Sequence, residues 1–265
     1  MVFAMTSIFP ALETIILAAG QGTRMRSDLA KVLHRLGGRP MIEHVVSTAQ
    51  ALNARTMHVV YGHGGDQVPA ALSGLPVRCV LQAPQRGTAH AVSQAMPAVG
   101  DDAVVLILYG DVPLIRPESL QPLIRAAADG ALALLTVELA DPNGYGRIMR
   151  DAEGGVRAIV EHKDATDAQR TIREIHTGML AAPARKLRDW LGRIRNDNAA
   201  GEYYLTDVVA LAVADGVPVT TAQAASVSET LGVNSRDQLA DLERIHQMNQ
   251  ARALMTAGVT LRDPA

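Results

Sequence analysis

Short apolar runs alternate with amphipathic segments through the first half of the chain, and this alternation constrains the fold most strongly. The apolar runs are expected to form strands at residues 14–19, 56–61, 77–82, 103–109 and 131–139. Helices are expected between them at 41–52, 66–72, 88–96 and 118–128, the last following Pro117 in a helix-start position. Continuous Val/Ile/Leu runs are typical of strands buried on both faces. We therefore predict an α/β fold with a mostly parallel central sheet and helices on both faces.

The pattern changes from about residue 145, which predicts a smaller mixed region after the parallel sheet. Two strands, 146–150 and 156–162, are expected to pair around a turn. Further strands are expected at 174–181 and 217–222, and helices at 184–194, 203–213 and 235–256. Asn234 or Ser235 could cap the last helix, and Gly258 is expected to end it.

Composition excludes several classes of protein. At 265 residues and 48% hydrophobic, the chain can bury one large core or two modest ones. A net charge of −2 and 3% aromatic residues provide neither a basic field nor stacking platforms for nucleic acid. The single cysteine, Cys79, lies in an apolar run and is expected to be a buried structural thiol. The sequence shows no signal peptide or membrane span, so we expect a cytoplasmic protein.

Residues 14–26 place an apolar strand directly before a glycine-rich loop that carries an arginine. Gly20 and Gly22 can take φ values closed to other residues, so successive backbone N–H groups can surround an anion. Arg24 adds a fixed charge, and Lys31 follows within reach. A dinucleotide fingerprint would need glycine where Met25 stands, and the P-loop pattern is absent. The segment predicts a triphosphate site, with an ordinary strand-to-helix turn as the alternative.

Polar residues follow two other predicted strands. Asp111 comes after the strand at 103–109, where a carboxylate near phosphates could bind Mg²⁺; the alternative is a turn aspartate before Pro113. Gln82 has an amide that could match both the N3–H and a carbonyl of uracil, and Thr88 opens a helix beside it. That segment could also be a surface loop with a threonine cap.

The second half offers weaker candidates. The Glu161 carboxylate could accept hydrogen bonds from two sugar hydroxyls, or belong to a solvated run of charge. His176 lies in an apolar strand, where a histidine is more often a core residue than a ligand. Residues 144–147 could donate backbone hydrogen bonds or form a turn, and 201–204 are expected to start a helix. No serine-nucleophile elbow or zinc-type cluster is present, which favours transfer between two phosphorylated reactants.

Eight motifs in order resemble one family. They are LAAGQGTRM (17–25), YGHGG (61–65), LQ (81–82) with GT (87–88), YGDVP (109–113), GYGR (144–147), EHKD (161–164), GEYY (201–204) and GVN (232–234). From about Thr14 onward the chain resembles the uridylyltransferase domain of the bacterial bifunctional N-acetylglucosamine-1-phosphate uridylyltransferase / glucosamine-1-phosphate acetyltransferase family. The first loop marks only the wider sugar-nucleotidyltransferase class, whereas the full ordered set is highly specific.

This resemblance implies a Rossmann-like fold that joins UTP to N-acetylglucosamine 1-phosphate, with Mg²⁺, to give pyrophosphate and the UDP-sugar used for cell-wall synthesis. The implied nucleotide-binding residues are Leu17, Ala18, Ala19, Gly20, Lys31, Gln82, Gly87, Thr88, Tyr109 and Gly110. Arg24 and Lys31 are the implied catalytic residues facing the phosphates. The implied metal ligands are Asp111 and Asn234, and the implied sugar contacts are Gly146, Glu161, Asn234 and, more weakly, His176.

Three residues depart from the family pattern. Gln21 stands where a lysine is usual, which removes one charge, and Ala30 replaces a proline before Lys31, which is expected to loosen the loop. His176 replaces an asparagine, so we expect the KM for the sugar phosphate to vary between about pH 5.5 and about pH 7.5.

The resemblance also implies a domain organisation. Residues 1–258 are expected to form the transferase domain and 259–265 a linker toward a left-handed β-helix that supplies acetyl transfer and trimer assembly. This chain is then expected to lack acetyltransferase activity and to be monomeric. Two alternatives remain: a related nucleotidyltransferase using another nucleotide or sugar phosphate, and a noncatalytic nucleotide-binding module.

Overall fold

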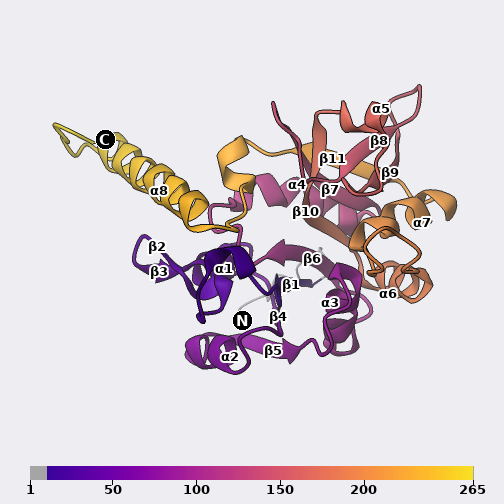
Figure 1. The fold of residues 1–265 in the computed structure, drawn as a ribbon, viewed down its shortest axis with the longest axis horizontal. Helices are drawn as coiled ribbons and strands as arrows, with labels where there is room; N and C mark the ends of the chain where they lie inside the picture. Colours follow the sequence, from indigo (N-terminus) through magenta and orange to yellow (C-terminus); the bar gives the residue numbers. More distant parts are fainter. Residues whose placement is uncertain (1–10, 265) are drawn as a thin grey trace, which may run out of the picture.

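The computed structural model describes residues 11–264, whose elements are labelled in Figure 1. Residues 1–10 and 265, including the chain start expected to lack a signal peptide, lie outside the described residues. The strands are β1 (Leu12–Ala18), β2 (Arg35–Leu36), β3 (Arg39–Pro40), β4 (Thr56–Tyr61), β5 (Val77–Leu81), β6 (Val104–Tyr109), β7 (Leu132–Glu138), β8 (Arg147–Arg150), β9 (Val156–Val160), β10 (Glu174–Pro183) and β11 (Val219–Gln223). The α-helices are α1 (Met41–Ala51), α2 (Gln67–Ala71), α3 (Thr88–Ala95), α4 (Pro117–Ala128), α5 (Asp167–Arg170), α6 (Ala184–Arg193), α7 (Val208–Ala214) and α8 (Arg236–Thr256).

The central sheet is mostly parallel, as predicted. Its main row has the order β11-β7-β10-β6-β1-β4-β5. β1 runs parallel to β6 and β4 on its two sides, with Ile15 opposite Ile107 and His58. Within this row β10 alone is reversed, because it pairs antiparallel with both β6 and β7. The β8–β9 hairpin extends from β10 and forms the expected mixed region.

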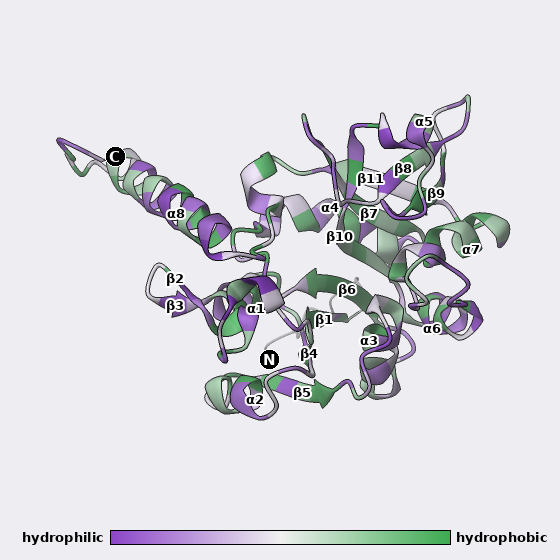
Figure 2. Ribbon diagram, in the orientation of Figure 1, coloured by the Kyte–Doolittle hydropathy of each residue, from purple (hydrophilic) through white to green (hydrophobic). Residues whose placement is uncertain are grey.

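Helices cover both faces of the sheet. Successive residues of a strand point to opposite sides, so neighbouring residues of one strand pack in different cores. Ile15 and Leu17 of β1 pack in a core with side chains of α3, α6 and α7. Ile16 and Ala18, one residue further along, pack in the core on the other face with side chains of α1 and α4. Figure 2 shows the central strands as predominantly hydrophobic and α8 as mixed along its length. The fold prediction of a doubly covered sheet is confirmed.

The last helix, α8, extends away from the sheet, and the chain end lies at its far tip (Figure 1). Within this helix only Leu242 and Ala251 are buried. Its first half contacts the short β2–β3 hairpin, where the Gly37 N–H donates to Glu243 Oε2 at 2.7 Å. None of the helices in residues 11–264 is both long and apolar enough to cross a membrane.

The largest error in the expected elements lies at the segment expected to be helical from residue 203. Tyr203 lies outside any helix: its N–H donates to the Arg86 carbonyl in the loop before α3, and its own carbonyl accepts from the Ala89 N–H in α3. A 3₁₀ turn begins only at Leu205, and α7 begins at Val208. The short elements β2, β3 and α5 were not predicted. Cys79 on β5 is only partly buried, and burial raises the pKa of its thiol.

Candidate active site

The loop after β1 is shaped by close backbone packing against Lys31. Gly22 has φ of 62°, and a Cβ added there would lie 2.7 Å from Lys31 Cβ, so only glycine fits. The loop then forms two 3₁₀ turns, Thr23–Met25 and Lys31–Leu33. This turn structure brings Arg24 and Lys31, seven positions apart in the sequence, to the carboxyl edge of the sheet.

A cavity of about 480 Å³ lies at this edge. The predicted residues that line it are Leu17, Ala18, Ala19, Gly20, Lys31, Gln82, Gly87, Thr88, Tyr109 and Asp111. Gln21 lines it too, where the resemblance led us to expect a missing charge. Gly110 does not line the cavity; it is buried, and its N–H donates to the Leu17 carbonyl at 2.9 Å. A Cβ there would lie 3.2 Å from Val32 Cγ1 and 3.4 Å from Ala18 Cβ, so Gly110 packs against residues that line the cavity.

Gln82 is held in one orientation by its neighbours. Its side chain is buried, and Nε2 donates to the Gly87 carbonyl and to His90 Nδ1, both at 3.0 Å. The amide nitrogen therefore has its partners inside the protein, and the Gln82 oxygen is left as an acceptor. This corrects the expectation that both faces of the amide would read a base. Gly87, with φ of 109°, cannot be replaced because a Cβ there would lie 2.5 Å from the Tyr203 carbonyl oxygen.

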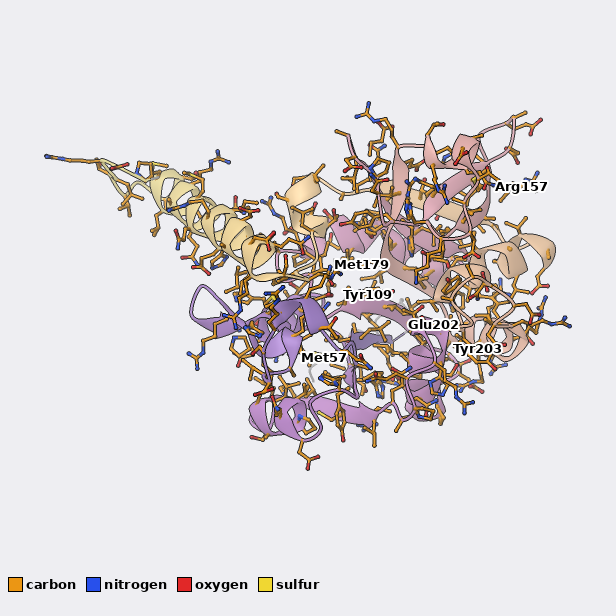
Figure 3. All side chains as sticks on the ribbon, viewed as in Figure 1. Met57, Tyr109, Arg157, Met179, Glu202 and Tyr203 are labelled. Carbon is orange, nitrogen blue, oxygen red and sulfur yellow. The ribbon has the colours of Figure 1, made fainter. Side chains whose placement is uncertain are left out.

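A second cavity, of about 460 Å³, shares Thr88, Tyr109 and Asp111 with the first. The predicted residues that line it are Arg24, Asp111, Gly146, Glu161, His176 and Asn234. Figure 3 shows Tyr109 near the centre of the molecule, at the end of β6, with Glu202 and Tyr203 toward α3. Two ligands bound in these cavities would therefore meet beside Tyr109 and Asp111.

At the junction, a carboxylate and an amide oxygen converge on one cation. Lys31 Nζ donates to Asp111 Oδ2 at 2.5 Å and to Asn234 Oδ1 at 3.0 Å. The Asn234 segment is fixed there, because the Val233 N–H donates to the Asp111 carbonyl and the Asn234 N–H donates to Gln238 Oε1. Asp111 follows β6, Lys31 begins a 3₁₀ turn after the first loop, and Asn234 precedes α8. The oxygens of Asp111 and Asn234 nevertheless lie together around one positive charge.

Glu161 faces the second cavity just beyond β9. Its Oε1 accepts a hydrogen bond from Thr206 Oγ1 at 3.0 Å, and burial raises the pKa of its carboxyl. Gly146 packs beside it: a Cβ there would clash with Ile159 Cγ2 at 2.7 Å, whereas Glu161 Oε1, at 3.6 Å, would be in ordinary contact. Behind Glu161, burial and the charges of Glu161 and Asp164 raise the pKa of Asp207 to about 6. The site thus holds a carboxylate acceptor in a partly desolvated, acidic surrounding.

His176 lines the second cavity from a buried position on β10. Only 6% of its surface is exposed, and Nδ1 has no hydrogen-bond partner among the described residues. Burial lowers the pKa of His176 to about 4. Burial therefore contradicts the premise of the expected KM variation between about pH 5.5 and about pH 7.5, which was an imidazole that titrates in that range, because desolvation favours the neutral form.

Comparisons with known proteins show the family of this chain. A family model described as the MobA-like NTP transferase domain matches residues 14–260. The chain belongs to this family. The transferase domain is also 59% identical over 256 residues to the bifunctional protein GlmU of Thiobacillus denitrificans, covering 97% of this chain and 56% of the relative. It is 58% identical over 254 residues to that of Alkalilimnicola ehrlichii, covering 96% of this chain and 55% of the relative. The chain thus spans about half the length of these relatives.

A solved structure supports the fold of the transferase domain. A nucleotidyl transferase from Methanothermobacter thermautotroptrophicus superposes with a TM-score of 0.58 at 24% identity, covering 88% of this chain and 96% of that one. At this identity the likeness concerns the fold alone.

Several residues that line or support the two cavities were missed by the sequence reasoning. Thr206 supports Glu161 from 45 positions away, and Glu202 lines the first cavity. Gln85 Nε2 donates to the Ala19 carbonyl at 2.7 Å and joins the loop after β5 to the loop after β1. Tyr145 lines the second cavity. Tyr145 and Glu202 lie within the GYGR and GEYY motifs but were given no role there, whereas Thr206 and Gln85 lie outside the motifs, and their partners are far away in the sequence.

Proposed function

We propose that this domain transfers the uridylyl group of UTP to N-acetylglucosamine 1-phosphate and releases pyrophosphate. The observation that carries the proposal is the pair of cavities that meet at Tyr109 and Asp111. One is bounded by the glycine-rich loop and the Gln82 amide, as a nucleoside triphosphate requires. The other holds Glu161 and backbone groups suited to sugar hydroxyls. The ordered motifs of the sequence favour these two substrates over others.

Asp111 and Asn234 would hold Mg²⁺. The fit rests on their oxygens, which already converge on one cation, the Lys31 ammonium. Within residues 11–264 no group of three or more His, Cys, Asp or Glu could hold a metal, so phosphate oxygens and water would complete the Mg²⁺ shell. When bound, Mg²⁺ would neutralise phosphate charge.

The chain's own residues would orient and neutralise the reactants. The Gln82 oxygen accepts from the uracil N3–H, and Glu161 accepts from sugar hydroxyls. Arg24 and Lys31 neutralise the pyrophosphate that leaves. An oxygen of the sugar phosphate attacks the α-phosphorus of UTP in line, the bond to the β-phosphate oxygen breaks, and no protein nucleophile takes part. Alignment of two bound reactants can contribute roughly 7–11 kcal/mol to lowering the barrier.

We also propose the domain organisation implied by the resemblance. Residues 1–258 would form the transferase unit and 259–265 a linker, with trimer formation and acetyl transfer belonging to a β-helix domain of the family. We further propose that this domain acts in the cytoplasm, without nucleic acid or membrane partners.

One assay separates the proposal from its alternatives. Pyrophosphate release would be measured with N-acetylglucosamine 1-phosphate and UTP, CTP or dTTP, each with Mg²⁺ or with excess chelator. Release that requires UTP, this sugar phosphate and Mg²⁺ is expected. Faster release with another nucleotide or sugar phosphate would favour a related transferase. UTP binding without any release would favour a noncatalytic nucleotide-binding module.

A further inference from the structure

The loop of residues 20–30 carries Arg24 and leads into Lys31, so its conformation sets where both cations lie. Much of the loop is exposed, and Arg26 takes a left-handed backbone with φ of 48°. Side chains from elsewhere hold its backbone. Arg236 Nε donates to the Met25 carbonyl at 3.0 Å, and Gln67 binds the stretch just before Lys31.

Gln67 contacts this stretch with both ends of its amide. Its Oε1 accepts from the Ala30 N–H at 3.1 Å, and its Nε2 donates to the Asp28 carbonyl at 3.1 Å. Gln67 is the first residue of α2, so a regular helix anchors the amide. Two bonds to positions two residues apart restrict the backbone between them far more than one bond would.

The residue held in this way is the one directly before Lys31. Ala30 is buried, with φ of −54° and ψ of 134°, and it begins the 3₁₀ turn that contains Lys31. Gly64 packs against it so closely that a Cβ there would lie 2.9 Å from Ala30 Cβ. The expectation of a looser loop at Ala30 therefore overlooks a compensating contact: the N–H that a proline would lack is bound by Gln67.

We propose that Gln67 is a positioning residue of the transferase site, which fixes Ala30 and thereby places Lys31 against Asp111 and Asn234. The Gln67 side chain does not line either cavity and acts through the backbone of residues 28–30. Its kinetic consequence rests on the proposed function, whereas its effect on the loop does not.

The test replaces the amide and then restores the backbone restriction by other means. Gln67→Ala removes both bonds, and the double variant Ala30→Pro with Gln67→Ala returns a restricted φ, because −54° lies within the range of proline. In the double variant residue 30 is a proline and has no N–H, so the loss of Gln67 leaves no backbone donor unpaired there. Gln50→Ala, at an exposed glutamine on α1, is the matched control.

Two readouts, kcat/KM and the rate of trypsin cleavage, are compared among variants whose melting temperatures match that of the parent. Gln67→Ala should lower kcat/KM for pyrophosphate release about tenfold, and the double variant should recover to within about threefold of the parent. Trypsin cleavage after the exposed Arg26 in the native protein should be faster in Gln67→Ala and return toward the parent rate in the double variant. Gln50→Ala should change neither readout.

The inference is overturned if Gln67→Ala cleaves at the parent rate, or if adding Ala30→Pro restores neither rate. If the parent releases no pyrophosphate from any substrate pair, the proposed function fails, and the cleavage rates alone still decide the role of Gln67 in the loop.

Discussion

Replacing Lys31 by methionine should strengthen the binding of a divalent cation and at the same time abolish efficient transfer. In the structure, Lys31 Nζ lies 2.5 Å from Asp111 Oδ2 and 3.0 Å from Asn234 Oδ1, and both charged side chains are largely buried. A divalent cation that binds these two oxygens must first displace the ammonium. Lys31→Met keeps an unbranched side chain and removes only this competitor.

The size of the effect follows from the bond that must be broken. A hydrogen bond between charged groups contributes about 1.5–3 kcal/mol net. Because about 1.4 kcal/mol corresponds to a tenfold change in affinity, Lys31→Met should bind the cation roughly 10–100-fold more tightly. Turnover should nevertheless fall about 10²–10³-fold, since a charge that stabilises the departing pyrophosphate is lost.

Mn²⁺ is the practical probe, because the free ion can be counted by electron paramagnetic resonance in the absence of nucleotide. Lys163→Met, at an exposed lysine after β9, should leave Mn²⁺ binding unchanged. Asp111→Asn should weaken Mn²⁺ binding, and this result would show that the ion binds at the oxygens of Asp111 and Asn234. The reasoning is refuted if Lys31→Met binds Mn²⁺ no more tightly than the parent while Asp111→Asn loses it.

Three further predictions concern the second cavity and its surroundings. Arg24→Ala should lower turnover in the pyrophosphate assay by about 10²–10³-fold, and near-normal turnover would reject its role. His176→Asn should change the KM for the sugar phosphate without changing the shape of its pH profile between about pH 5.5 and about pH 7.5, because the pKa of His176 is about 4; a lost inflection would contradict this. Asp207→Asn should raise the free energy of unfolding by about 1–2 kcal/mol at pH ~7.5. The full difference in pKa would correspond to ~3 kcal/mol, but solvent screens this half-buried carboxyl and reduces the effect. The pKa of Asp207 is raised from 3.8 to about 6, so the folded state loses stability as the pH rises through that interval, and the gain should vanish near pH ~4 in urea titrations. Asp197→Asn, an exposed neighbour in the same acidic region, is the control.

Much of the fold followed from the sequence because buried parallel strands carry their own signal. The run expected at 56–61 coincides with β4, and that expected at 103–109 differs from β6 by one residue. Tyr203 shows the limit of this reasoning. Its surroundings have helical spacing, but its N–H pairs with Arg86 in the loop before α3 and its carbonyl with Ala89 at the start of α3, and no local pattern encodes these partners.

The same limit applies to the site. Residues directly after strands, such as Asp111, could be placed because the carboxyl ends of parallel strands share one edge. The pairing of Lys31 with Asp111 and Asn234 could not, since these residues lie 80 and 203 positions from it. His176 illustrates a third case: its residue type indicates a titratable group, but only the burial seen in the structure determines that it stays neutral.

The reversed direction of β10 explains why the second cavity is harder to predict than the first. Leu180 of β10 pairs with Ile107 of β6, so the earlier part of β10 extends past Tyr109 at the carboxyl edge of the parallel strands. A register shift between His176 and Leu180 and the left-handed φ of 94° at Gly178 bring this backbone against the Tyr109 ring, where a Cβ would lie 2.6 Å away. A reversed strand thus contributes its beginning to an edge where parallel strands contribute their ends. A search confined to residues that follow strands finds the first cavity and misses the residues that β10 contributes to the second, among them His176 and Gly178.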